Sequence, residues 1–367
     1  IAEAMLGFGD KAVELFRMIK APIWLSNCLV LGVYRVLAWV ISVMLPPMAI
    51  FFPLFTLLED LGYLPRIAFN LDRCFKKCKT CGKQALTMCM GFGCNAAGVT
   101  GARIIDSPRE RLIAILTNSF VPCNGRFPAI ISIITMFFVG FNVSLGNSLL
   151  TTVILTLVIL MGIFMTFTIS RLLSNTILKG MPSSFTLELP PYRKPQIGKV
   201  LIRSIFDRTL FVLGRAISVA APAGLVIWVL ANVNYNGLSL LEYCSNFLDP
   251  IGSLMGLDGV ILMAFILGFP ANEIVIPLII MGYMAMGTIT EFDNLVELKK
   301  LLISNGWTTT TAINFIVFSL FHFPCSTTCM TIRKETGSNK WMFVAIIIPT
   351  LVGFIFCVLI NLFFKII

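Results

Sequence analysis

The chain has 367 residues, of which 57% are hydrophobic and only 13% charged, and its mean hydropathy is +0.91. Soluble domains carry about a quarter charged residues, so this composition excludes an ordinary soluble globular protein. The net charge of +10 comes from lysines and arginines that cluster between hydrophobic runs, as in the cytoplasmic loops of membrane proteins. No basic groove interleaved with aromatic residues accompanies them, so nucleic acid is not expected as a partner.

Long apolar runs follow one another along most of the chain. About 20 apolar residues are enough to cross a bilayer as a helix. In chain order the runs are 23–35 (short and amphipathic), 36–58, 84–101, 111–139, 148–171, 209–231, 259–287, 312–331 and 341–364. The sequence therefore predicts an all-α, polytopic integral membrane protein, a helical bundle embedded in membrane lipid.

Three short motifs recur in the same order in the two halves of the chain. The pairs are ISVMLPP (41–47) with ISVAAPA (217–223), MGFGCN (90–95) with LGFPAN (267–272), and VPCN (121–124) with FPCS (323–326). The first two pairs keep their spacing, since 53 residues separate Ser42 from Asn95 and 54 separate Ser218 from Asn272. The third pair is more widely spaced in the second half, which predicts an insertion around 288–311. The chain is therefore expected to contain an internal repeat.

The two repeats are predicted to have opposite orientations. Basic residues flank 84–101 on both sides, so this segment is expected to enter and leave the membrane on the cytoplasmic side as a re-entrant hairpin. Counting crossings back from the basic stretch 333–340 places the flanks of the matching segment outside. Such inverted-topology repeats occur in many transporters, with the substrate site at their interface. The expected parts are an N-terminal segment (1–35), a first repeat (36–171), a cytoplasmic linker (172–208) and a second repeat (209–367).

Four apolar runs are interrupted by glycine or proline beside polar side chains, at GFGCNAAG, PCNGRFP, GFPANE and HFPCSTTC. Non-helical backbone at membrane depth is tolerated only where it is buried in protein or lines a wet cavity. Sulfur ligands suit transition metals, and amide or carboxylate oxygens suit harder ions. A lone buried cysteine is as easily explained by packing, but the group as a whole favours an ion path. The candidate ligands are Cys94, Cys123, Cys325, Asn95, Asn124, Asn272 and Glu273, with Met88 and Met90 as nearby thioethers.

Cys74, Cys78 and Cys81 form a separate thiol cluster among lysines. Closely spaced thiols can hold a metal ion. The lysines are expected to lower the thiol pKa values, which would suit an accessory metal or redox relay. The alternative is a solvated turn beside the membrane.

Three further polar residues have two readings each. Glu59 and Asp60 end the run 36–58 and are either an interfacial helix end or a cytoplasmic mouth that collects or releases cations. The single histidine, His322, is expected to be a hydrogen-bonded structural residue rather than a ligand.

Five longer motifs stand in order along the chain: LLEDLGYLPRIAFNLDR, GFGCNAAGVTGARIIDSPRERLIAILTNSFVPCNGRFP, LELPPYRKP, GFPANEIVIP and FPCSTTCMTIRKETGSNKW. From about residue 36 to about residue 350 they resemble the membrane region of the ferrous iron transport protein B family. The resemblance implies two gate repeats, uptake of Fe²⁺ as the substrate, and the inner membrane of a bacterium as the location. It places Cys94 and Asn95 in the family's Gly-Cys-Asn motif, Cys123 in the break of the first gate and Cys325 in the Pro-Cys of the second. Many members have Val-Pro after Gly-Cys-Asn where this chain has Ala96-Ala97, so a less sharp break is expected here.

Family members usually carry an N-terminal GTPase domain, but no G-x4-G-K-[ST] phosphate loop occurs in this sequence. No nucleotide site and no nucleotide hydrolysis are therefore expected in the chain itself. It starts at Ile1 rather than at a methionine and is expected to be a piece of a longer gene product or one part of a split system. The resemblance implies a GTPase domain in the full-length protein or in trans, and it leaves room for a small cytoplasmic accessory protein and a homo-oligomer.

Two other functional classes stay open. Gate-type repeats also occur in permeases for nucleosides and other organic solutes, which would need an aromatic, amide-lined pocket. A membrane metal sensor that transports nothing would use the Cys74, Cys78 and Cys81 cluster. Thiol ligands alone do not select Fe²⁺ from Mn²⁺, Co²⁺ and Zn²⁺, so iron rests on the resemblance.

Overall fold

A computed structural model describes residues 2–18, 22–140, 145–180, 198, 202, 209–235, 237–285 and 294–366. In this part of the chain almost every element is a helix, and the strands form one short hairpin. This confirms the all-α prediction. The expected linker (172–208) lies largely outside the described residues, and so does the LELPPYRKP motif within it.

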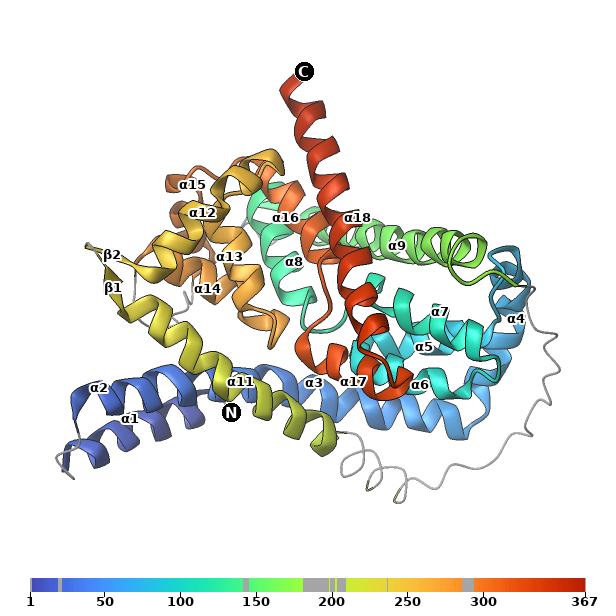
Figure 1. Ribbon diagram of the computed structural model, residues 1–367, viewed down its shortest axis with the longest axis horizontal. Helices are drawn as coiled ribbons and strands as arrows, with labels where there is room; N and C mark the ends of the chain where they lie inside the picture. Colours follow the sequence, from blue (N-terminus) through green and yellow to red (C-terminus); the bar gives the residue numbers. More distant parts are fainter. Residues whose placement is uncertain are drawn as a thin grey trace.

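The described helices and strands fall into two groups along the chain, before and after the expected linker (Figure 1). Before it lie α1 (Ala2–Met18), α2 (Ile23–Ser26), the π-helix η1 (Asn27–Tyr34), α3 (Arg35–Asp60), α4 (Tyr63–Lys77), α5 (Lys83–Gly93), α6 (Asn95–Gly101), η2 (Ala102–Ile104), α7 (Pro108–Thr117), η3 (Asn118–Phe120), α8 (Phe127–Ile134), η4 (Thr135–Val139) and α9 (Leu145–Asn175). After it lie α11 (Leu210–Asn232), β1 (Asn234–Tyr235), β2 (Leu238–Ser239), α12 (Leu240–Leu254), α13 (Gly259–Leu267), η6 (Asn272–Ile274), α14 (Val275–Tyr283), α15 (Leu295–Ser304), α16 (Thr309–Phe321), α17 (Ser326–Thr336) and α18 (Asn339–Ile366).

Within the described residues, five helical stretches are long and apolar enough to cross a membrane. They are Ile23–Asp60, Gly146–Asn175, Leu213–Asn232, Thr309–Thr336 and Asn339–Ile366. Helices α12 and α13 would form a sixth span, but they meet at a bend of 111°. The polytopic prediction is thus confirmed. The first span runs without a gap from α2 through α3, so the boundary expected at residue 35 falls inside a continuous helical stretch.

The first repeated motif lies inside long helices in both halves. Pro46 in α3 and Pro222 in α11 lack the N–H that a helix needs. The carbonyls four residues earlier, of Ser42 and Ser218, therefore lose their helical partners. Helix α11 packs against α3 and η1, which brings these two weakened helices together.

The α4–α5 and α12–α13 hairpins have the same internal geometry. The N–H of Gly82 donates to Asp72 Oδ1 (2.8 Å), and the N–H of Gly259 donates to Asp249 Oδ1 (3.0 Å), each across ten residues. A side chain on either glycine would overlap the carbonyl oxygen fourteen positions earlier. Hairpins from the two halves of the chain thus share the same glycine–aspartate hydrogen bond and the same close backbone contact, which supports the internal repeat.

The third motif shows the same correspondence. A Cβ atom on Gly162 of α9 would lie 2.7 Å from the carbonyl oxygen of Phe120, and one on Gly353 of α18 would lie 3.1 Å from that of Phe321. In both halves, therefore, the span that follows the break approaches it closely through a glycine. Helix α15 lies in the second half only among the described elements, where the insertion was predicted.

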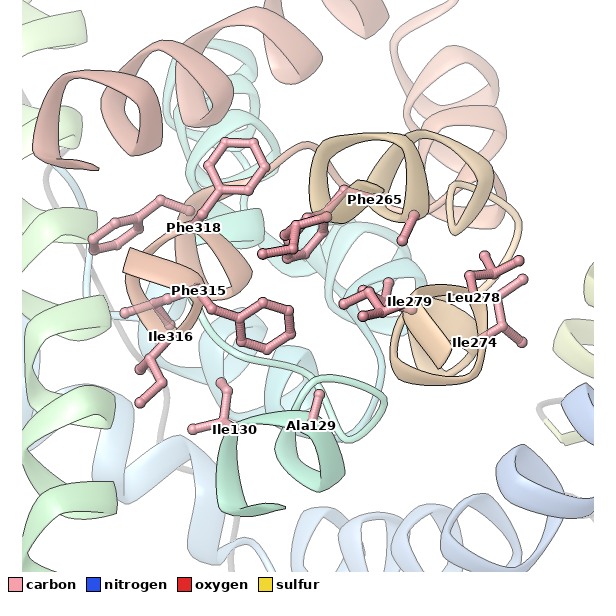
Figure 2. Close-up of a cluster of buried hydrophobic side chains, with 14 of the residues drawn as sticks. Ala129, Ile130, Phe265, Ile274, Leu278, Ile279, Phe315, Ile316 and Phe318 are labelled. Carbon is pink, nitrogen blue, oxygen red and sulfur yellow. The ribbon is translucent and has the colours of Figure 1, made fainter. Parts of the chain in front are cut away.

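The hydrophobic core is shared by the two repeats. Figure 1 shows α4–α7 at one end of the molecule and α12–α15 at the other, with α8 and α16 between them. In Figure 2, Ala129 and Ile130 of α8 face a cluster that includes Phe265 of α13, Ile279 of α14 and Phe315 of α16. The breaks of both repeats are thereby held inside a single packed body.

Candidate functional site

Helices α5 and α6 form a hairpin with Cys94 at its tip. A Cβ atom on Gly98 would lie 2.7 Å from the Thr87 carbonyl oxygen, so the two helices run side by side in opposite directions. Cys94 is extended, with φ −154° and ψ 124°. Ala271, at the matching position between α13 and η6, has the same angles. The segment 84–101 thus turns back on itself as predicted, and of these two matched tips only the first carries a thiol.

Asn95 and Asn118 tie this hairpin to the first proline break. The Asn118 amide donates to the Asn95 carbonyl (3.0 Å). With its nitrogen turned toward the available acceptors, the Asn95 side chain donates to the carbonyls of Gly91 (3.2 Å) and Val121 (3.3 Å). The amide nitrogen of Asn95 therefore holds the hairpin in place.

Cys123 lies in the first proline break and contacts the second repeat through Asn272. The Asn272 amide donates toward the Cys123 thiol, with 3.8 Å between Nδ2 and Sγ. Oδ1 of the same amide lies 3.2 Å from Nε2 of His322, whose Nδ1 lies 2.9 Å from the Ser319 carbonyl oxygen. Both ring nitrogens of His322 have hydrogen-bond partners, as expected of a structural histidine. Asn272 links a thiol of one repeat to the break of the other.

Cys325 stands directly before α17, in the second proline break. Its Sγ lies 3.2 Å from Oγ1 of Thr328. Cys94, Cys123 and Cys325 lie near enough to one another that a thiolate at one of them would be repelled by a thiolate at another. Among the described residues, however, no three His, Cys, Asp or Glu side chains converge into a complete metal site. Amide and backbone oxygens would have to complete the coordination of an ion here.

Asn124 and Glu273 lie beside these thiols. Asn124 lines a cavity of about 60 Å³ together with Gly93 and Met48. The Glu273 carboxylate packs against Gly125, in the first break. It is half-buried, and no ion pair of Glu273 is found in the described part of the chain. Its carboxyl oxygens are therefore available to a cation at the interface of the repeats.

The thioether next to Cys94 is that of Met48, in α3. Met48 packs in one cluster with Phe52 and Cys94. Met88 and Met90, which the sequence favours, pack in two other clusters. These two methionines therefore pack apart from the cluster of Cys94, because a helical segment directs its side chains around its axis and the chain reverses at Cys94.

Arg126, in the PCNGRFP break, is a polar residue of the site that sequence reasoning missed. It is only 1% exposed. Its Nη1 donates to the carbonyls of Ser119 (2.9 Å) and Leu320 (2.7 Å), and its Nη2 to those of His322 (3.2 Å) and Phe323 (3.4 Å). The signal that could have revealed it is a charged residue inside an interrupted membrane run.

Glu59 and Asp60 lie at the end of α3, as predicted. Asp60 is exposed, and the half-buried Glu59 lines a cavity of about 200 Å³ with Phe55, Met90 and Lys83 among its walls. The cavity lies beside α5, whose far end carries Cys94.

Cys74, Cys78 and Cys81 lie around the α4–α5 turn, but not as one thiol site. Cys74 is exposed, Cys78 half-buried and Cys81 buried. Burial raises the pKa of Cys78, and burial together with the Glu110 carboxylate raises the pKa of Cys81 to about 12. The expected lowering of the pKa by lysines is wrong for Cys78 and Cys81. No metal-binding group forms here among the described residues.

The fold and the site together define a class: a multi-pass membrane protein with two gate repeats whose broken helices meet at their interface. Residues 41–137 and 213–339 match the Gate family model, described as nucleoside recognition, and residues 155–207 match the ferrous iron transport protein B C terminus. The chain belongs to the ferrous iron transport protein B family, whose membrane region it represents.

Several curated relatives support this assignment. A protein named Fe(2+) transporter FeoB from Staphylococcus aureus (strain MSSA476) is 32% identical over 342 residues, 90% of this chain and 47% of that protein. Proteins of the same name from Methanocaldococcus jannaschii and Campylobacter jejuni are 28% and 27% identical, over 92% and 81% of this chain and 49% of each relative. The chain thus spans about half the length of these relatives. No solved structure matches it.

Proposed function

We propose that this chain forms the path by which ferrous iron crosses the membrane, between its two gate repeats. The observation that carries the proposal is that Cys94, Cys123 and Cys325, from three different breaks, lie within electrostatic reach of one another inside the membrane body. The relatives named Fe(2+) transporter support iron as the cargo.

The donor set suits a divalent transition metal. A thiolate binds Fe²⁺ through soft sulfur, while the amides of Asn124 and Asn272 and the Glu273 carboxylate add oxygen ligands. A dication at low dielectric also needs compensating negative charge, which Glu273 and a deprotonated thiol would provide. Asn95 contributes by holding the hairpin tip, since its amide nitrogen is engaged with carbonyls.

The path continues toward the cavity that Glu59 lines. Glu59 in this cavity, with Asp60 exposed beside it, gives a mouth that holds two carboxylates as well as the Lys83 ammonium, on the side predicted to be cytoplasmic. Cations that leave the thiols would reach this mouth along α5.

Uptake would be driven or gated by a GTPase that this sequence does not encode, in the full-length protein or in trans. A small cytoplasmic accessory protein and assembly into a homo-oligomer belong to the same proposal. So does a location in the cytoplasmic membrane of a bacterium.

A nucleoside or organic solute fits the interface less well. The cavity beside Asn124 does have aromatic walls, from Phe51, Phe52 and Phe92. Its volume of about 60 Å³ is well below the roughly 300 Å³ at which small-molecule pockets begin. The sensor alternative also weakens, because its three cysteines do not converge.

The test is metal transport and binding by serine variants under anaerobic, reducing conditions. We expect Cys94→Ser and Cys325→Ser to reduce Fe²⁺ uptake into proteoliposomes at least tenfold. They should also remove the thiolate-to-metal absorption band of bound Co²⁺, which reports on the site without any GTPase. Cys244→Ser, a half-buried cysteine of α12 outside the breaks, is the matched control. Unchanged uptake and an unchanged Co²⁺ band in both path variants would show that the thiols do not form the path.

A further inference from the structure

The guanidinium of Arg126 joins the ends of two broken helices from different repeats. One carbonyl that it holds, of Ser119, belongs to η3, and the others follow or end α16. Helices α8 and α16 pack against each other (Figure 1). Arg126 directly precedes α8. The side chain is thus a bridge across the interface of the repeats.

The carbonyls that Arg126 holds are those the breaks set free. Pro324 has no N–H, so Leu320, four residues earlier, loses its helical partner, and Arg126 Nη1 supplies a replacement at 2.7 Å. The C-terminal end of a half-helix also carries partial negative charge. Such ends, with unwound carbonyls, are where transporters coordinate cations.

We propose that Arg126 acts as a tethered cation. Its guanidinium occupies the group of carbonyls at the interface of the repeats (those of Ser119, Leu320, His322 and Phe323) and keeps a mobile dication out until the Arg126 side chain withdraws. This inference rests on the proposed function and adds a gating and charge-selecting residue to it. The guanidinium is held where four backbone carbonyls from the two repeats meet.

The surroundings of Arg126 favour movement over permanent anchoring. Its Nε is buried without a hydrogen-bond partner, which is costly for a charged group. The Glu273 carboxylate, with no ion pair of its own among the described residues, packs against the adjacent Gly125. Withdrawal of the side chain would release the carbonyls of Leu320 and His322 to an ion, with the Glu273 carboxylate as the new partner of the guanidinium.

The arginine is present in the break of the first repeat but not at the matching position of the second. In the matched break, where Cys325 corresponds to Cys123, the residue three positions later is Thr328 rather than an arginine. An arginine is suited to the task because its rigid fork reaches several carbonyls at once, whereas lysine is a single flexible point charge.

The experiment measures Fe²⁺ influx into proteoliposomes that contain the full chain, without nucleotide or partner protein. We expect Arg126→Gln to raise basal influx at least tenfold, with the larger change in Vmax rather than in KM. Arg126→Lys, which keeps the charge but loses the fork, should give an intermediate influx. Arg215→Gln is the matched control, because Arg215 also bridges helices, donating to Thr331 Oγ1 (2.9 Å) outside the breaks.

Each result decides the matter. Influx through Arg126→Gln that disappears when Cys94→Ser is added supports the tethered cation. Influx at or below that of the unchanged chain, in a variant with an unchanged unfolding temperature, overturns it. If Arg126→Gln does not fold, Arg126→Lys decides, since an unchanged influx there is also contradictory. Loss of uptake in Cys94→Ser with no effect of Arg126→Gln would leave the proposed function standing and reject only this inference.

Discussion

Arg103 and Glu335 form a bidentate ion pair that joins the two repeats. Nε and Nη2 of Arg103 each lie 2.7 Å from a carboxylate oxygen of Glu335. Arg103 follows the α5–α6 hairpin and Glu335 lies near the end of α17, so the pair connects the two segments that carry Cys94 and Cys325. It lies on the side predicted to be cytoplasmic, where the path would open.

Removing this pair should weaken the contact between the repeats modestly. The Arg103 side chain is 61% exposed, so we expect a coupling energy of only about 1 kcal/mol, near the upper end for exposed pairs because of the bidentate geometry. The measurement is a double-mutant cycle of Arg103→Gln and Glu335→Gln, by thermal unfolding in detergent at low and high salt. Lys83 and Asp106, whose carboxylate is 89% exposed, are the matched control, and a coupling there as large as in the first pair would contradict the argument.

The thiols around the α4–α5 turn should differ sharply in reactivity. Cys74 is exposed, whereas Cys81 is buried with a pKa of about 12. At pH 8 only about one Cys81 in ten thousand would be a thiolate, the reactive form. Maleimide labelling followed by mass spectrometry should therefore modify Cys81 at least about 100-fold more slowly than Cys74. Because the thiolate fraction grows tenfold per pH unit below the pKa, the Cys81 rate should still be rising at pH 10. Equal rates at pH 8 would refute this description, and Cys81→Ser assigns the label.

Much of the fold could be predicted because its determinants are local. Apolar runs of membrane length, and glycine or proline within them, mark the spans and their breaks without any knowledge of contacts. The repeat was also visible, since Cys94 and Ala271 stand in matching motifs and share one backbone conformation. The continuous helix from Ile23 to Asp60 was not predicted, because an amphipathic start and an apolar continuation look like two elements in sequence.

The candidate site could be predicted only in part, because its contacts span long distances in sequence. Arg126 and Leu320 are 194 residues apart, and Asn272 and Cys123 are 149 apart. No pattern near Arg126 says that it faces another break rather than lipid headgroups. Met48 was missed for the same reason, since its neighbour Cys94 belongs to a different helix pair.

The Met48 thioether should contribute to metal transit if the proposed path is right. Leucine has a similar volume, so Met48→Leu keeps the packing against Phe52 and Cys94 but removes the sulfur. We expect the KM for Fe²⁺ uptake to rise about fivefold, about 1 kcal/mol, with Vmax retained. Met88→Leu, in a cluster with Phe75 and Val121, serves as the control. A KM unchanged in the first variant, or raised equally in both, would show that the sulfur of Met48 takes no part.

Gly82 and Gly259 should be equally intolerant of alanine if the hairpins they close are true equivalents. In each, a Cβ atom would overlap a backbone carbonyl of the opposite helix and crowd the aspartate that accepts the glycine N–H. Neither backbone carbonyl can move without disturbing its helix, so we expect Gly82→Ala and Gly259→Ala to lower stability by about 3 kcal/mol each. Gly214→Ala is the control, because nothing lies within 4 Å of its Cβ position and alanine is the better helix former. The measurement is thermal unfolding in detergent. If Gly82→Ala leaves the unfolding temperature unchanged while Gly259→Ala lowers it, the two hairpins share their backbone geometry but not their packing, and the prediction that they are equivalent is wrong.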